Sequence, residues 1–260
     1  MAAAAGVNVC ESALVPLEAL DPTHGYALGG SAHFLAVSRF DRQGAKRIHC
    51  EDFAQVLGVD PRNKYTGATY AGVAAVMMRY PDSLGLAAVH ELLRLITINE
   101  LMGNYEAHFK NFCLSYPDGT TPVLSKAVDI VAWSAYLGGQ DHALALYRAE
   151  SKNPEQPKVF NTLSPGALRE FCNRVGIAEQ ACTTVIRDTV ALALQSWPGM
   201  IAKSTILDEQ KERLITRIQS RSFAQRRSRR VVAPWPIRGL RSALRSARDH
   251  WLRRPVFALK

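Results

Sequence analysis

The pattern of apolar and polar positions divides the chain into an extended first part and a helical remainder. Residues 33–40 form an apolar run rich in β-forming residues, and prolines and glycines interrupt the stretch before it. From Glu51 onward, apolar residues recur every three or four positions, which is typical of amphipathic helices. This pattern predicts a short helix with Phe53 and Leu57 on one face and Gly58 at its end.

Two further helices are predicted before the middle of the chain. The first covers residues 70–79 and stops before Pro81. The second is the longest, because it begins at Ser83 as N-cap and continues to Gly103. Its predicted buried face consists of Leu86, Val89, Leu93, Ile96 and Leu101.

A β-hairpin is predicted directly after this long helix. Residues 112–116 and 122–125 are apolar, β-forming segments, and the turn signal Pro117-Asp118-Gly119 lies between them. Asn111 and Asp129 lie at the two open ends of such a hairpin. The hairpin therefore brings these two side chains close together, as two ligands of one metal ion require.

The last third of the chain reads as helical. Ser164-Pro165 opens one helix, Gly176 closes it, and further helices are expected over 179–197 and 205–219. The predicted class is α+β, mostly α. The expected division is into strands at 1–50, a helical lobe at 51–220 and a tail at 221–260.

Composition restricts the class of protein. The sequence of 260 residues is 47% hydrophobic and 21% charged, as in a globular protein. No apolar run reaches the roughly 18 residues of a membrane span, and the first residues lack the features of a secretion signal. The five cysteines form no CxxC pair, which favours reduced, buried thiols and a cytoplasmic protein.

The net charge of +9 belongs to the tail. Residues 221–260 hold 12 Lys and Arg against one acid, whereas the preceding 220 residues hold 20 basic and 22 acidic side chains. Residues 239–251 show a basic amphipathic pattern that suits DNA or an anionic surface. A solvated extension without function is the alternative.

The candidate chemistry lies at residues 103–112, which read GNYEAHFKNF. Glu106, Asn111 and Asp129 supply a carboxylate, an amide and a second carboxylate in the order of a phosphoryl-transfer site. In such a site the first carboxylate accepts a proton from the attacking hydroxyl, while the other two groups hold Mg²⁺ on ATP. Lys110 could neutralise phosphate or be solvated, and His108 could bind nucleotide or be structural.

Four segments resemble the HipA family of serine/threonine kinases from type II toxin–antitoxin systems. GNYEAHFKNF is similar to the family's GNTDAHAKNF-type catalytic segment, and LAVSRFDR at 35–42 resembles its hinge strand. IHCEDFAQVLG at 48–58, followed by Lys64-Tyr65, resembles the RxxQEDFCQALG-like helix of the family. AVDIV at 127–131 stands where the family has its metal-binding aspartate. The match covers residues 6–215.

The resemblance implies a kinase-like C-terminal lobe that uses ATP and Mg²⁺ and phosphorylates a protein substrate. Its implied residues are Glu106 as catalytic base, and Asn111 and Asp129 as metal ligands. The implied nucleotide contacts are Ser38, Arg39 and Phe40 at adenine, with His108, Lys110, Asn111 and Asp129 beside the nucleotide. Its implied partner is a HipB-like helix-turn-helix antitoxin.

Two departures from the family pattern change the expected activity. Glu106 stands where the family has aspartate, and a displacement of about 1 Å at a reacting centre can cost about 100-fold in rate. The family's phosphate loop, its ATP-anchoring lysine and the partner acid precede the hinge, but the residues before His33 show none of them. The N-terminal lobe is therefore expected to be largely missing, with a separate chain as one possible source.

Three functions stay open on this sequence. The first is a kinase toxin component impaired by truncation. The second is a catalytically weak, pseudokinase-like module that binds an antitoxin or nucleotide. The third is a nucleic-acid-associated protein acting through its basic tail.

Overall fold

The computed structural model describes residues 1–20, 23, 33–136, 144–149 and 158–221. Its helices in this part of the chain are α1 (Phe53–Val56), α2 (Tyr70–Met78), α3 (Gly85–Met102), α4 (Pro165–Val175), α5 (Glu179–Lys203) and α6 (Asp208–Ser220). Its strands are β1 (Ser12–Pro16), β2 (His33–Val37), β3 (Arg42–Gln43), β4 (Lys46–Arg47), β5 (His49–Asp52), β6 (Cys113–Tyr116), β7 (Val123–Leu124), β8 (Tyr147–Ala149) and β9 (Lys158–Phe160).

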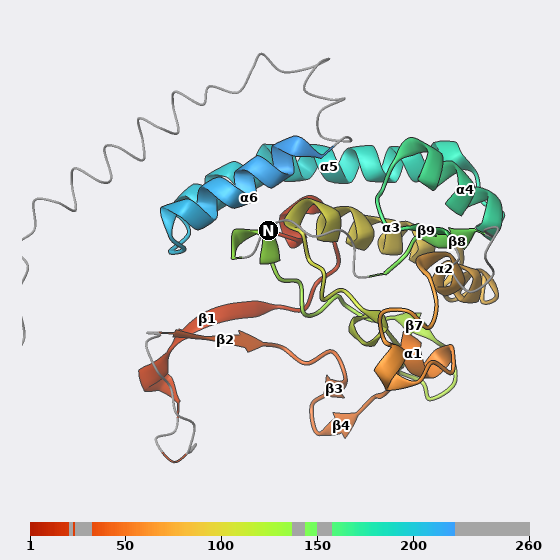
Figure 1. The fold of residues 1–260 in the computed structure, drawn as a ribbon. Helices are drawn as coiled ribbons and strands as arrows, with labels where there is room; N and C mark the ends of the chain where they lie inside the picture. The colour runs from red at the N-terminus through yellow and green to blue at the C-terminus, as the bar shows by residue number, and fades with distance from the viewer. Residues whose placement is uncertain (21–22, 24–32, 137–143, 150–157, 222–260) are drawn as a thin grey trace, which may run out of the picture.

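Helix α3 is the centre of the molecule. It packs against α2, α5 and α6, and α5 and α6 form a layer along one side of it (Figure 1). Strands β1 to β4 lie at the opposite end from this layer, and most strands form small sheets of two. The fold is therefore α+β, with about half of the described residues in α- or 3₁₀-helices, as the sequence predicts.

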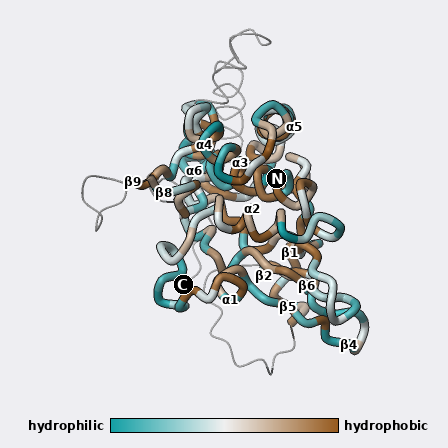
Figure 2. The backbone as a smooth tube through the Cα atoms, turned by 90° about the vertical axis from the view of Figure 1, so that its right-hand side faces the viewer, coloured by the Kyte–Doolittle hydropathy of each residue, from teal (hydrophilic) through white to brown (hydrophobic). Residues whose placement is uncertain are grey.

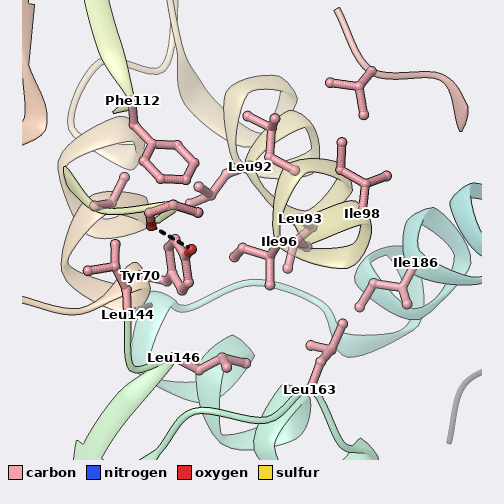
Figure 3. Packing of buried hydrophobic residues seen from close by; sticks show 14 of the residues in the cluster. Tyr70, Leu92, Leu93, Ile96, Ile98, Phe112, Leu144, Leu146, Leu163 and Ile186 are labelled. Carbon is pink, nitrogen blue, oxygen red and sulfur yellow. Dashed lines mark hydrogen bonds between the residues drawn. The ribbon is translucent and has the colours of Figure 1, made fainter. Parts of the chain in front are cut away.

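The hydrophobic core surrounds α3. Leu92, Leu93 and Ile96 are fully buried, and Figure 3 shows them between Tyr70 of α2 and Leu163. Tyr70 is also buried, and its ring meets that of Phe112 edge-on at 5.7 Å between centroids. Its hydroxyl donates to the backbone oxygen of Ala107 at 3.3 Å, so the core directly supports the residues around 103–112.

The predicted hairpin is confirmed. Strands β6 and β7 pair antiparallel, with Leu114 opposite Leu124. A third strand, β5, pairs with β6 on the other side. The expectation of helix from Glu51 was wrong for the first two residues: Glu51 and Asp52 end β5, and α1 begins at Phe53 with Asp52 as its N-cap.

The start and the buried face of α3 differ from the prediction. Ser83 is not the N-cap, because it lies in the preceding turn, where its N–H bonds the Tyr80 oxygen, and Leu84 holds the capping position. Leu86 is 41% exposed, so its assignment to the buried face was wrong. The other four predicted positions are buried, because from Val89 onward the helix lies in the core.

The C-terminal helices follow the predicted signals, with one exception. The Ser164 hydroxyl accepts from Ala167 N–H at the start of α4, and Gly176 ends the helix in a left-handed conformation at φ 75°. Helix α5, however, does not end at Trp197. It continues through Pro198 to Lys203, because buried Ile201 secures the turns after the proline to the core.

The first ten residues belong to the helical body. Ala5 and Val7 are in the core, and the Trp197 indole donates to the Met1 oxygen at 2.9 Å. The Asn8 N–H donates to the Glu91 carboxylate on α3 at 2.7 Å. The N-terminal segment therefore packs with the helices, and the predicted division of the chain at residue 50 stays a prediction.

Strands β1 and β2 form an antiparallel ribbon with an apolar, exposed surface. Leu14 and Leu35 are direct cross-strand partners, and they are 66% and 63% exposed. Apolar stretches of this ribbon are brown in Figure 2. A two-stranded ribbon is only marginally stable alone, so this pair of strands is a surface suited to further contacts.

Two further sequence predictions concern cysteines and membranes. All five cysteines are free thiols, although Cys50 and Cys113 are only partly buried. Within the part of the chain that the structure describes, no helix is long and apolar enough to cross a bilayer. The basic tail lies outside the described residues, apart from Arg221.

Candidate active site

The loop of the candidate site begins where α3 ends. Gly103 is the left-handed C-cap of α3 at φ 65°, a conformation that favours glycine. A Cβ atom at this position would lie 2.6 Å from Nε of Arg217, which donates to the Glu100 oxygen at 3.0 Å. Gly103 therefore gives the chain both the reversal and the space needed to leave the helix.

Asn104 connects the loop to the rest of the site. This side chain is 2% exposed. Its Nδ2 donates to Oδ1 of Asn99 at 3.1 Å and to the Asp129 backbone oxygen at 3.3 Å. Its Oδ1 accepts from the Glu106 N–H at 3.2 Å. The buried Asn104 side chain thus holds the backbone of both Glu106 and Asp129, the two residues that carry the candidate carboxylates.

Asn111 and Asp129 are in direct contact, as the hairpin predicted. Asn111 Nδ2 donates to Asp129 Oδ2 at 2.9 Å and to the Glu106 backbone oxygen at 2.8 Å. The amide nitrogen makes both of these bonds. Oδ1 of Asn111 has no hydrogen bond to any described residue. An amide oxygen and an exposed carboxylate are therefore available side by side.

Asp129 has an unusual backbone conformation. Its φ is 57°, and among the described residues no other residue except glycine has a positive φ. Left-handed residues of this kind cost energy and are concentrated at functional sites. The conformation is held by the bond from Asn104 and by a bridge between Val9 and Ala127, two residues earlier. The N-terminal segment thus helps to place Asp129.

The Glu106 carboxylate has three neighbours. Oε2 accepts from the Tyr65 hydroxyl at 2.8 Å, and it lies 3.8 Å from Nε2 of His108 and 4.0 Å from Nζ of Lys64. Its side chain is 35% exposed. The carboxylate is thus reachable from solvent but held at one oxygen.

Two pKa values around Glu106 are shifted. Burial raises the pKa of Tyr65 to about 12, and the bond to Glu106 adds to this shift. Burial lowers the pKa of His108, and the charge of Lys64 lowers it further. Tyr65 therefore stays a hydrogen-bond donor and His108 stays neutral at pH 7. Nδ1 of His108 is buried without a hydrogen-bond partner among the described residues.

Lys110 faces away from Glu106. Its Nζ lies 3.6 Å from the carboxylate of Asp52, the residue that caps α1. This side chain is 45% exposed, so the ion pair is weak. Its predicted contact with nucleotide stays a prediction.

The predicted adenine-binding residues are connected to the site only through intervening residues. Ser38 N–H donates to the Glu11 oxygen at 2.8 Å, and the Phe40 N–H bonds the sulfur of Cys10. Cys10 N–H in turn donates to the Ala127 oxygen at 3.2 Å. The Arg39 guanidinium pairs with Asp41. In the described structure, none of the three residues bonds Glu106, Asn111 or Asp129.

The ligand set suits magnesium bound together with a nucleotide. Magnesium prefers oxygen ligands and is usually held by one or two protein groups plus substrate phosphates. Asn111 and Asp129 supply two such groups and border a small cleft with Asn99 and Asn104. Among the described residues, no three His, Cys, Asp or Glu side chains gather into a metal-binding group. A site that relies on phosphate oxygens fits this arrangement.

Three residues of the site were not found by sequence reasoning. Lys64 and Tyr65 are over 40 positions from Glu106, and only the fold reveals that they meet. Asn104 reads as an ordinary loop residue after a glycine. The available signal for Lys64 and Tyr65 was the family resemblance, which includes this pair but assigns no function to either residue.

Comparison with known proteins places this geometry in a family. The HipA-like C-terminal domain matches residues 1–197. The chain belongs to the HipA-like C-terminal domain family, as the sequence resemblance indicated. Its relatives include "Putative kinase Y4dM" of Sinorhizobium fredii, 34% identical over 194 residues, which are 74% of this chain and 44% of that protein. A "Putative kinase" of Haemophilus influenzae is 29% identical over 136 residues, 48% of this chain and 39% of that protein.

One solved structure supports the fold. HipA of Shewanella oneidensis, in its complex with HipB and operator DNA, matches with a TM-score of 0.62 at 21% identity, over 89% of this chain and 56% of that one. The chain spans less than half the length of the curated relatives it matches. The protein is therefore a HipA-like relative of proteins that are named putative kinases.

Proposed function

We propose that this chain carries the catalytic and metal-binding part of a HipA-like serine/threonine kinase that transfers the γ-phosphate of ATP to a protein hydroxyl. The observation that carries this proposal is the contact of Asn111 with Asp129 at 2.9 Å, in which the same Asn111 amide also bonds the backbone oxygen of Glu106 at 2.8 Å. Glu106 accepts the proton of the attacking hydroxyl. Asn111 and Asp129 hold Mg²⁺, which offsets phosphate charge when bound.

The cofactors in this proposal are ATP and Mg²⁺. His108 and Asn111 lie on the loop beside Glu106, and Ser38, Arg39 and Phe40 line the adenine end. Neutral His108, whose Nδ1 has no hydrogen-bond partner among the described residues, supports a hydrogen bond to nucleotide. The cytoplasm, with its supply of ATP and reduced thiols, is the proposed compartment.

The proposed partners follow from the family and from the exposed ribbon. A HipB-like helix-turn-helix antitoxin is the proposed regulator, as in the solved HipA complex. Exposed Leu14 and Leu35, which face each other in the two-stranded ribbon of β1 and β2, support contact with further strands of an N-terminal lobe. This lobe belongs to the same protein or to a separate chain.

The test is phosphoryl transfer by the purified chain. With Mg²⁺ and [γ-³²P]ATP, the wild type labels itself or an added protein, and Asp129→Ala abolishes the label. Glu106→Asp restores the family's residue, and its activity distinguishes a kinase from a module that binds without catalysis. If the wild type neither binds Mg-ATP nor transfers phosphate, and Glu106→Asp restores nothing, the kinase proposal fails.

A pseudokinase-like binding module is the second candidate. Glu106 in place of the family's aspartate is the observation that favours it. Under this alternative, ATP or antitoxin binding persists in the wild type without any transfer. Binding without labelled product, in the wild type and in Glu106→Asp, would select the binding module.

A third candidate assigns nucleic-acid binding to the basic tail. Its 12 basic side chains against one acid favour this role. Deletion of residues 221–260 is then expected to abolish salt-dependent DNA binding. Equal binding before and after the deletion would remove this candidate.

A further inference from the structure

Among the described residues, the polar side chains around the Glu106 carboxylate all lie near the same one of its two oxygens. The Tyr65 hydroxyl, His108 Nε2 and Lys64 Nζ lie 2.8, 3.8 and 4.0 Å from Oε2. No described residue forms a hydrogen bond or an ion pair with Oε1. The two oxygens of this carboxylate are therefore in different environments.

Two of these three neighbours, Lys64 and Tyr65, are themselves held in place. Lys64 follows a 3₁₀ turn at Pro61–Asn63 that is capped by Asp60. The backbone oxygen of Lys64 accepts from Phe109 N–H at 3.4 Å, which joins this segment to the catalytic loop. The Lys64 ammonium lies over the ring of Tyr65, 4.9 Å from its centroid. Both functional groups thus approach Glu106 from one fixed support.

The ring of Tyr65 is also supported from the loop. It meets the His108 ring edge-on, with centroids 5.3 Å apart and an interplanar angle of 74°. His108 is 8% exposed, so this neighbour is well packed. The position of the Tyr65 hydroxyl is therefore fixed from two sides.

A glutamate needs such support more than an aspartate does. It has one more rotatable bond, so its carboxylate samples more positions and loses more entropy when it is ordered. A hydrogen bond from a phenol to a carboxylate is charge-assisted and stronger than a bond between neutral groups. The bond to Tyr65 can therefore select one rotamer of Glu106.

We propose that Tyr65 is a positioning residue that, together with Lys64, anchors Glu106 through Oε2 and leaves Oε1 as the atom that accepts the substrate's proton. This inference rests on the proposed kinase function. In the step, the substrate O–H bond breaks and its proton moves to Oε1. The hydroxyl oxygen forms a bond to the γ-phosphorus. The bond from that phosphorus to the β,γ-bridging oxygen breaks, and its electron pair leaves with ADP.

The anchor is tested first without any measurement of activity. In protein labelled with [¹³Cζ]tyrosine, Tyr65→Phe assigns the Tyr65 signal at pH 7. Glu106→Gln replaces the charged acceptor by a neutral one and is expected to shift this signal. Tyr116 offers a matched control, since it donates to Glu51 at 2.6 Å on the β5–β6 sheet. Its signal is expected to respond to Glu51→Gln and not to Glu106→Gln. An unchanged Tyr65 signal in Glu106→Gln would overturn the anchor.

Kinetics then test the positioning role. Tyr65→Phe is expected to lower kcat about 10- to 100-fold, as misplacement of a reacting group does, with KM for ATP unchanged. In the Glu106→Ala background the same substitution is expected to have no further effect. Lys64→Arg is expected to retain more activity than Lys64→Ala, and Tyr116→Phe to match the wild type. An undiminished kcat in Tyr65→Phe, or an equal loss in both backgrounds, would refute the positioning role.

The two measurements separate this inference from the function on which it rests. A Tyr65 signal that responds to Glu106→Gln, in a wild type that transfers no phosphate, would reject the kinase and retain the anchor. Transfer by the wild type with a Tyr65 signal that ignores Glu106→Gln would retain the kinase and reject the anchor.

Discussion

At the scale of single residues, the candidate site depends on buried amides as much as on carboxylates. Asn104 is buried and bonds Asn99, Glu106 and Asp129. Each of these bonds pairs polar groups that are at least partly buried. The positions of the two candidate carboxylates are thus linked through the buried side chain of Asn104.

We expect Asn104→Ala to destabilise the fold by about 1–3 kcal/mol, since a buried polar group left without its partner costs that much. The loss should appear as a lower midpoint in urea unfolding. Asn173→Ala, at an exposed position of α4, is the matched control and should change stability by no more than about 0.5 kcal/mol. Equal stability of the two variants would contradict the role given to Asn104.

Sequence reasoning reached part of this site. Glu106, Asn111 and Asp129 were identifiable because they lie within 24 positions and a strong turn signal fixes the hairpin between the last two. Asn104, Lys64 and Tyr65 were not, because their roles depend on contacts between segments distant in sequence. The direction of Lys110 toward Asp52 was equally hidden, since it depends on where α1 packs.

At the scale of elements, the end of α3 determines where the candidate site's loop, residues 103–112, begins. Gly103 has φ 65°, and the Arg217 side chain lies in the space of its missing Cβ. A side chain here meets both backbone strain and a buried guanidinium. Both the positive φ of residue 103 and its close packing against Arg217 therefore require a glycine at this position.

Gly103→Ala is expected to lower the free energy of unfolding by more than about 1 kcal/mol, through its positive φ and its contact with Arg217. Gly199→Ala provides the opposite case, because this glycine lies inside α5 with no atom within 4 Å of an added Cβ. That variant should be about 0.5–1 kcal/mol more stable than the wild type. Thermal unfolding of both variants tests the pair, and a stabilised Gly103→Ala would contradict the geometry.

Helices were easier to predict than strands for a physical reason. The ends of α4 are marked by local signals, a serine and proline at the start and a glycine at the end. Strand β5 carries the polar sequence His49–Asp52, and it is a strand only because β6 pairs with it. Strands β8 and β9 likewise depend on each other. Pairing with a distant segment leaves no local pattern.

At the scale of the whole molecule, distant parts of the chain converge on the site. The Asn8 backbone bonds Glu91 of α3, and the next residues bridge to Ala127 near Asp129. From the other side, Arg217 of α6 bonds the Glu100 oxygen at the end of α3. The packed helices thus fix the end of α3 and the segment around Asp129 relative to each other.

We expect Arg217→Met to cost about 1.5–3 kcal/mol of stability, because it removes a charged donor from the buried Glu100 oxygen. Arg213→Met, on the same helix but with its side chain 45% exposed, should cost at most about 0.5 kcal/mol. Unfolding in urea measures both values. A difference of less than about 0.5 kcal/mol between the two variants would exclude α6 as a support of the site.

We propose that Asn111 and Asp129 hold a magnesium-bound nucleotide beside Glu106, and calorimetric titration with ATP decides this. Asparagine tolerates the left-handed conformation of residue 129 but removes its charge, so Asp129→Asn should keep the fold. The account predicts Mg²⁺-dependent ATP binding in the wild type and in the exposed control Asp82→Asn, and at least about 10-fold weaker binding in Asp129→Asn. Equal affinity in all three proteins, or affinity that does not depend on Mg²⁺, would contradict it.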